Sequence, residues 1–132
     1  MSLDILIIDD EADIRDLISE TLRDEGYDTR TAGNSDEGLK ALAVRVPNLL
    51  ILDIWLQGSE LDGLGILEIV RKKYPHLPVV MISGHGNIET AVNSIKMGAT
   101  DFLEKPFKED RLLLIIANAL ESARLRHENR EL

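Results

Sequence analysis

The sequence predicts a single α/β domain built on a parallel sheet of five strands with helices on both faces. Short continuous apolar runs recur along the chain, each bounded by turn-forming residues, as expected for strands buried on both faces. Segments with apolar residues at helical spacing lie between these runs, and such alternation implies parallel strands joined by right-handed crossovers. The first, third and fourth runs are the most apolar and belong at the centre, which favours the strand order 2-1-3-4-5.

Turn and capping residues set the limits of the expected elements. The expected strands cover residues 3–8, 27–32, 49–53, 77–82 and 101–104. The second strand is more polar than the others, so we expect it at or near an edge of the sheet. Gly26 follows the first helix as a C-terminal glycine, and Asn34 with Glu37 forms a variant of the capping box before the second. Pro75 ends the third helix, expected at residues 63–74.

Each expected helix carries apolar residues at helical spacing. In the first four helices these residues are Ile14, Leu17, Ile18 and Leu22; Leu39, Leu42 and Ala43; Ile66, Leu67 and Val70; and Ile88, Ala91, Val92 and Ile95. Asn87 is the expected N-cap of the fourth helix. The fifth helix begins near Lys108, and its run 112–116 has more consecutive apolar residues than one buried face needs. We expect another surface to cover the surplus.

Composition narrows the function classes. The 132 residues suffice for one domain, and the 44% of apolar residues predict a folded core. The absence of cysteine excludes disulfides, thiolate nucleophiles and cysteine metal sites, and it suits a cytoplasmic protein. No membrane span or secretion signal is visible. The net charge of −9 argues against direct nucleic-acid binding, which depends on neutralising phosphates, and suits a protein that binds metal cations.

Polar side chains follow four strands of the predicted sheet. Asp9 and Asp10 come after the first strand, Asp53 ends the third, Ser83 ends the fourth and Lys105 follows the fifth. The carboxyl ends of parallel strands share one edge of the sheet, where ligands bind in such folds. Each pair of carboxylates about 4 Å apart costs about 4 kcal/mol at an effective dielectric of about 20. The sequence therefore predicts an all-oxygen site for Mg²⁺ or Mn²⁺.

Each of these signals has an ordinary structural explanation when it stands alone. An Asp-Asp pair after a strand is usually a solvated turn, and a lone strand-end aspartate is often a cap. Ser83 could be a simple cap and Lys105 a surface lysine. The convergence of acid, hydroxyl and amine from four strands favours a site.

The set Asp9-Asp10, Asp53, Ser83 and Lys105-Pro106 resembles the receiver domain of bacterial two-component response regulators. The resemblance covers residues from about 4 to 122 and implies a flavodoxin-like (βα)5 fold. Segments 82–86 and 96–107 are similar to the nitrogen-regulation subgroup, with its NtrC-like and NtrX-like members. The loop 55–63 is longer than in most receivers and has Gln57 where a proline is common, as in the NtrX-like branch.

The resemblance implies roles for the clustered residues. Asp53 would accept a phosphoryl group from a phosphohistidine of a sensor histidine kinase. Asp10, Asp53 and the backbone carbonyl of Trp55 would bind Mg²⁺ (or Mn²⁺), with Asp9 acting through water. Lys105 would contact the phosphoryl group, beside a cis bond to Pro106.

The resemblance also implies a switch. Ser83 would move toward the phosphoryl group, and Phe102 would turn inward, although plain core packing of Phe102 is an equal alternative. Trp55 and His85 would flank the attacking water and modulate the lifetime of the aspartyl phosphate, although His85 could instead be an exposed loop residue.

The output surface would be the fourth helix, the last strand and the fifth helix, and a homodimer would form through it. Residues 1–122 would be the receiver. Residues 123–132 would extend the last helix toward a missing effector region that binds DNA, or form a frayed tail.

Two other functions compete with a phosphorylated signalling switch. A phosphate-independent interaction module of the same fold usually lacks an acid, the lysine or the acceptor aspartate, and none is missing here. A small phosphatase using Asp53 would need a general acid two residues later, where Trp55 stands. A dinucleotide-binding protein is disfavoured because no glycine-rich turn follows the first strand. We therefore expect a signalling domain rather than an enzyme with a free substrate.

Overall fold

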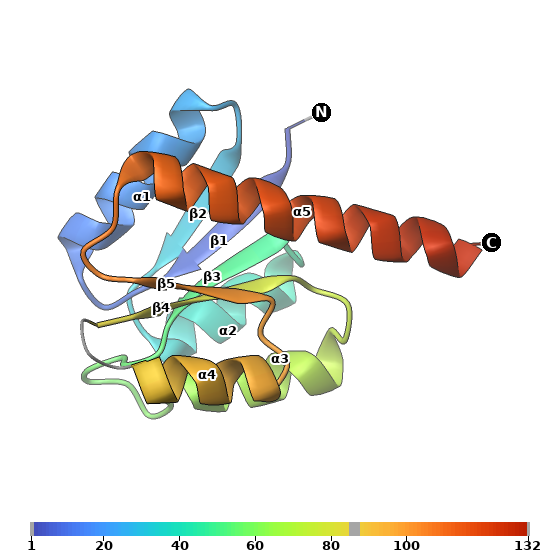
Figure 1. The fold of residues 1–132 in the computed structure, drawn as a ribbon. Coiled ribbons are helices and arrows are strands. Elements are labelled where there is room, and N and C mark those ends of the chain that lie inside the picture. The colour runs from blue at the N-terminus through green and yellow to red at the C-terminus, as the bar shows by residue number, and fades with distance from the viewer. Residues whose placement is uncertain (1, 85–87, 132) are drawn as a thin grey trace.

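A computed structural model describes residues 2–84 and 88–131, with side chains of the last helix as far as Arg126. Five parallel strands form one sheet in the order β2-β1-β3-β4-β5, as the sequence predicts (Figure 1). The strands are β1 (Asp4–Ile8), β2 (Asp28–Ala32), β3 (Leu49–Asp53), β4 (Val79–Ser83) and β5 (Asp101–Glu104). The predicted polar second strand does lie at an edge.

The helices cover both faces of the sheet. They are α1 (Ala12–Asp24), α2 (Ser35–Val44), α3 (Gly63–Lys73), α4 (Ile88–Lys96) and α5 (Glu109–Glu131). Helices α1 and α5 lie on one face, and α2, α3 and α4 lie on the other (Figure 1). Within the described ranges, no helix is both long and apolar enough to cross a membrane.

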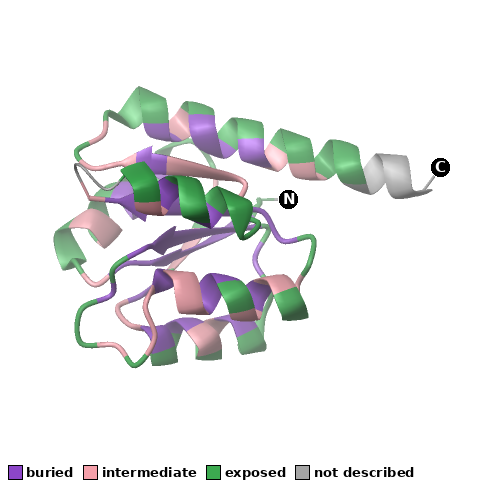
Figure 2. Cartoon of the chain, turned by 60° about the horizontal axis from the view of Figure 1, so that its bottom comes forward, coloured by how far each residue is buried: buried purple, intermediate pink, exposed green. Residues whose placement is uncertain are grey.

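The core has two layers because successive strand residues point to opposite faces. Ile5 and Ile7 of β1 contact the side of α1 and α5, whereas Leu6 and Ile8 contact the other side. Every residue of β1, β3 and β4 is buried, whereas β2 is mostly not. Figure 2 shows the buried strands between helices whose outer faces are exposed.

The predicted helix ends are present, with one difference. Gly26 follows α1 with a φ of +92°, a left-handed conformation that favours glycine. The Asn34 side chain accepts a hydrogen bond of 2.8 Å from the Glu37 amide, as a capping residue does. The carboxylate of Glu37 accepts from the amide of Gly33 instead of the amide of Asn34, so the capping box is displaced by one residue. Asn87 lies outside the described residues.

Several predicted helix faces are rotated or exposed. Leu17 is 39% exposed, and Ala43 is exposed because α2 turns Ser35, Gly38 and Leu42 toward the sheet. A Cβ at Gly38 would lie 2.5 Å from Cδ1 of Ile8, so a larger residue there would require the Ile8 side chain to move. The apolar pattern was a correct sign of helix here but a poor guide to its buried side.

Helix α4 contacts the sheet through small residues and exposes its large ones. Ala91 and Ser94 are buried, whereas Ile88, Val92 and Ile95 are 57%, 42% and 39% exposed. In α5, Leu112 and Ile116 are buried but Leu114 is 53% exposed. The exposure of Leu114 is consistent with the apolar surplus that the sequence predicts for run 112–116.

A polar cluster fixes the start of β1. Arg30 donates to Asp4 from two nitrogens, with the shortest distance 2.7 Å. It also donates to the carbonyl of Ala41 within α2 and to the carbonyl of Arg45 directly after it. Although burial opposes ionisation of Asp4, the guanidinium groups of Arg30 and Arg45 lower the pKa of its carboxyl below the usual value. The cluster joins β1, β2 and α2, and so holds the strand that leads to Asp9.

Replacing Arg30 with glutamine should lower the free energy of unfolding at pH 7 by about 2–3 kcal/mol, because the buried charge of Asp4 would keep only the more exposed Arg45 as its partner. Because the pKa of Asp4 is lowered by folding, the stabilisation exists above its unfolded pKa and disappears as the pH falls through its folded pKa. Urea denaturation at pH 7 and pH 3 measures both effects. Lys40→Gln, which removes an exposed ion pair with Asp36, is the control; equal losses for the two variants would contradict the prediction.

Candidate functional site

Lys105 lies at the centre of a group of carboxylates. Its Nζ is 3.0 Å from Glu11 Oε1, 3.2 Å from Asp9 Oδ2 and 3.3 Å from Asp53 Oδ2. Asp9 follows β1, Asp53 ends β3 and Lys105 follows β5, so three strand ends supply these groups. The arrangement follows from the parallel sheet, which places all these ends at one edge.

Four acids are close enough to share one cation. Asp9, Asp10, Glu11 and Asp53 each offer a carboxylate oxygen, and these oxygens all lie within 4.8 Å of one another. Asp9 is fully buried and Asp53 is 4% exposed, and Asp9 Oδ2 has no hydrogen-bond partner with good geometry although it faces Lys105. Carboxylate oxygens in this number suit a hard divalent cation such as Mg²⁺. The residues present therefore fit the metal expected from the sequence.

Glu11 is a member of this cluster that the sequence analysis did not assign. Its carboxylate makes the shortest contact with Lys105, and its amide donates a 2.8 Å hydrogen bond to Asp9 Oδ1. The position of Glu11 directly after Asp9 and Asp10 is the one feature of the sequence that could have predicted its role. A third acid in an exposed turn, however, usually faces solvent.

Burial shifts the protonation equilibria of the cluster. Burial, together with the nearby Asp9 charge, raises the pKa of Asp53 to about 7, against the opposing effect of Lys105. Burial likewise raises the pKa of Asp9. Burial of Lys105 favours its neutral form, but the charges of Asp53 and Asp9 and a hydrogen bond to Glu11 raise its pKa above the usual value. A cation in the cluster would favour the ionised carboxylates.

The backbone around Asp53 is tightly packed against the start of α3. The Gly63 amide donates a 2.7 Å hydrogen bond to the carbonyl of Ile54, and a Cβ on Gly63 would lie 2.0 Å from the carbonyl oxygen of Asp53. Only glycine fits there. The Trp55 amide donates to Asp53 Oδ1 at 3.3 Å, and Trp55 is 49% exposed.

The remaining predicted residues lie around this edge. Ser83 is fully buried at the end of β4, its Oγ has no hydrogen-bond partner among the described residues, and its carbonyl accepts a 2.8 Å hydrogen bond from the Lys105 amide. The Lys105–Pro106 peptide bond is cis, as expected. Phe102 is half-buried and packs against the core beneath α2, α3 and α4. His85 lies outside the described residues.

A cavity of about 700 Å³ lies at the opposite edge of the sheet, between the amino ends of the strands and α5. Its lining includes Leu3, Tyr27, Asn48 and Pro78, which precede or begin the first four strands. None of the clustered acids lines it, so we place the candidate site at the carboxyl edge.

Comparison with known proteins identifies the family. The sequence profile of the response regulator receiver domain matches residues 5–117. The chain belongs to this receiver family. The resemblance inferred from the clustered residues is thereby confirmed, and the strand order agrees with the receiver fold.

High-identity relatives place the receiver in the NtrX-like subgroup. The chain is 61% identical over 132 residues to the nitrogen assimilation regulatory protein NtrX of Azorhizobium caulinodans, covering 100% of this chain and 29% of that protein. It is also similar to the crystal structure of the receiver domain of NtrX from Brucella abortus, with a TM-score of 0.88 and 62% identity over 89% of this chain and 98% of that one. A structure of Brucella abortus NtrX in complex with ADP gives a TM-score of 0.96 and 58% identity over 98% of this receiver and 30% of that chain. The receiver thus spans less than a third of the curated NtrX relatives.

In the absence of divalent metal, the receiver should become less stable as the pH rises from about 4 to about 7. Folding raises the pKa of Asp53 to about 7, so its contribution is full below the unfolded value and is lost as the pH passes about 7. This shift corresponds to at most about 4 kcal/mol. Urea denaturation in a chelator measures the slope, and Asp53→Asn should flatten it. An equal slope in both proteins would show that Asp53 does not control it.

Proposed function

We propose that this receiver is a phosphorylatable signalling switch in which Asp53 accepts a phosphoryl group from a phosphohistidine of a sensor histidine kinase. The observation that carries the proposal is the 3.3 Å contact between Asp53 and Lys105 within a cluster of four acids, of which Asp9 and Asp53 are buried. A structural ion pair needs one acid, whereas Lys105 faces three. The surplus of carboxylates over ammonium groups favours binding of a cation, and a bound cation would support phosphoryl transfer to Asp53.

In the proposed reaction, an Asp53 carboxylate oxygen attacks the phosphorus atom. The new oxygen–phosphorus bond forms as the nitrogen–phosphorus bond of the phosphohistidine breaks, and the imidazole leaves with the electron pair. Lys105 stays protonated at neutral pH because the acids raise its pKa, so its ammonium can stabilise charge on the phosphoryl oxygens. This chemistry depends mainly on positioning and electrostatics.

The same edge would hold the metal expected of the family. Asp10, Asp53 and the carbonyl of Trp55 would bind Mg²⁺, with Asp9 acting through water. When bound, Mg²⁺ supplies positive charge that neutralises the carboxylates and the transferred group. Ser83 Oγ is buried and has no hydrogen-bond partner within residues 2–84 and 88–131, so it would be available to donate a hydrogen bond to a phosphoryl oxygen.

The output would pass through the surface formed by α4, β5 and α5. Movement of Ser83 toward the phosphoryl group would change the packing of half-buried Phe102 in β5. The exposed apolar residues Ile88, Val92 and Leu114 on this surface suit a second receiver as partner. The receiver has a net charge of −9, which disfavours direct contact with DNA. Control of transcription would then depend on a DNA-binding region outside this chain.

The alternative is a receiver-like interaction module that works without phosphate. It is favoured by the exposed apolar surface alone, which needs no chemistry at Asp53. The two functions make opposite predictions for phosphorylation.

Incubation with acetyl phosphate and Mg²⁺ should add one phosphoryl group to the wild-type protein and none to Asp53→Ala, because the acceptor is then missing. Intact-mass spectrometry measures the gain, and a chelator should abolish it. A folded wild-type protein that gains nothing would favour the interaction module.

Replacing Trp55 with alanine should shorten the lifetime of the aspartyl phosphate several-fold. The Trp55 amide is hydrogen-bonded to Asp53 and the residue is about half exposed, so we expect its indole to hinder the attacking water. Phosphate release from the purified phosphorylated protein measures the rate. The reverse result, an unchanged or longer lifetime, would remove Trp55 from the list of modulating residues.

A further inference from the structure

The loop between β3 and α3 contacts the acid cluster at a point that the proposed function leaves unexplained. The amide of Gln57 donates a hydrogen bond of 3.3 Å to Asp10 Oδ2. Among the described residues, this is the one N–H donor hydrogen-bonded to the Asp10 carboxylate. Asp9 and Asp53 have Lys105 beside them, whereas Asp10 depends on the loop.

The same loop is fastened to the start of α2. Ser59 Oγ accepts a 3.1 Å hydrogen bond from the Ser35 amide, and the Leu61 amide donates in return to Ser35 Oγ at 3.4 Å. The Ser35 amide is one of the first-turn donors of α2 that have no partner within the helix. Ser59 therefore satisfies a helix end that is distant in sequence, and the reciprocal bonds fix the position of the loop.

Ser59, which contacts α2, and Gln57, which contacts Asp10, are separated by one residue. Gly58 has a φ of +76° and turns the chain between Gln57 and Ser59. On the other side of Gln57, Leu56 is 5% exposed and belongs to the core. The Gln57 amide is thus held between a core anchor and a helix cap, which leaves it little freedom to leave Asp10.

We propose that Gln57, Ser59 and Ser35 form a latch that positions Asp10 and thereby sets the affinity of the acid cluster for Mg²⁺. The inference rests on the proposed function, because it assumes that Asp10 binds the metal. An amide on one carboxylate oxygen fixes the orientation of Asp10 and leaves its other oxygen for the cation. Gln57 and Ser59 act through Asp10 and are positioning residues.

The test is a Mg²⁺ titration followed by the fluorescence of Trp55, the one tryptophan of the chain, beside the site. Gln57→Pro removes the N–H, whereas Gln57→Ala keeps it, so their ratio isolates the hydrogen bond. We expect Gln57→Pro to bind Mg²⁺ about three- to tenfold more weakly than Gln57→Ala.

Ser59 gives an independent variant that leaves residue 57 intact. Ser59→Ala should weaken Mg²⁺ binding in the same direction, and Ser59→Thr, which keeps the hydroxyl, should restore it. Ser122→Ala, an exposed serine on α5, is the matched control and should bind as the wild type does. A merely structural role for Ser59 would lower the melting temperature without changing the Mg²⁺ affinity of the folded protein.

The outcomes separate the latch from the proposed function. Equal affinities for Gln57→Pro and Gln57→Ala overturn the latch. If Gln57→Pro does not fold, the comparison of Ser59→Ala with Ser59→Thr decides, and equal affinities again overturn it. A wild-type protein that binds no Mg²⁺, by contrast, contradicts the proposed function and the latch together.

Discussion

The attraction between one lysine and several buried carboxylates is the interaction on which the site depends. Two like charges about 4 Å apart repel by about 4 kcal/mol at an effective dielectric of about 20. Asp9 and Asp53 are almost fully buried. Lys105, which follows β5, offsets part of the repulsion between their charges. Burial raises the pKa of both acids despite Lys105, and the Asp9 charge adds to the rise in the pKa of Asp53. The site therefore holds a deficit of positive charge that a cation can fill.

The fold could be predicted almost entirely from the sequence because the three central strands, β1, β3 and β4, are each marked by an uninterrupted apolar run. The helical patterns on either side of the more polar β2 indicate its place in the alternation. In a parallel sheet covered by helices on both sides, the central strands are buried whichever face each side chain points to. An error of one residue in the predicted bounds of such a strand therefore does not change the predicted topology. The same parallel arrangement explains why Asp53 and Lys105, 52 positions apart, could be expected together. Their strand ends meet at one edge whatever the details of the helices.

The features that could not be predicted depend on packing detail. Helix α2 buries Gly38 rather than Ala43 because Ile8 fills the space that a side chain would need. Glu11 joins the acids because its turn bends back toward Lys105. Gly63 is required by the close approach of α3 to the backbone of Asp53, which no apolar pattern records. Each of these is a matter of a few ångströms, which spacing in a sequence does not specify.

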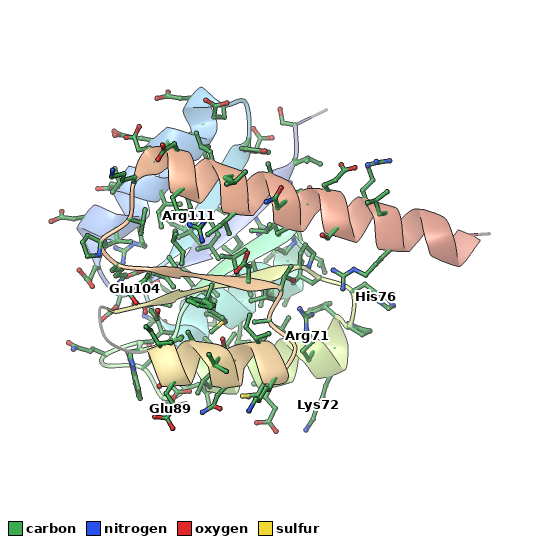
Figure 3. All side chains as sticks on the ribbon, viewed as in Figure 1. Arg71, Lys72, His76, Glu89, Glu104 and Arg111 are labelled. Atoms are coloured by element: carbon green, nitrogen blue, oxygen red, sulfur yellow. The ribbon has the colours of Figure 1, made fainter. Side chains whose placement is uncertain are left out.

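The continuity of α5 has a geometric consequence. The helix runs as one unit over Glu109–Glu131 (Figure 3). Among its residues whose side chains the structure describes, Ala119 is the last buried one. Beyond Ala119 the chain continues as a regular helix, which advances about 1.5 Å and turns about 100° with each residue. The number of residues in this segment therefore sets the orientation of any domain joined to its end. Deleting one residue from the segment would rotate such a domain by about 100° about the helix axis.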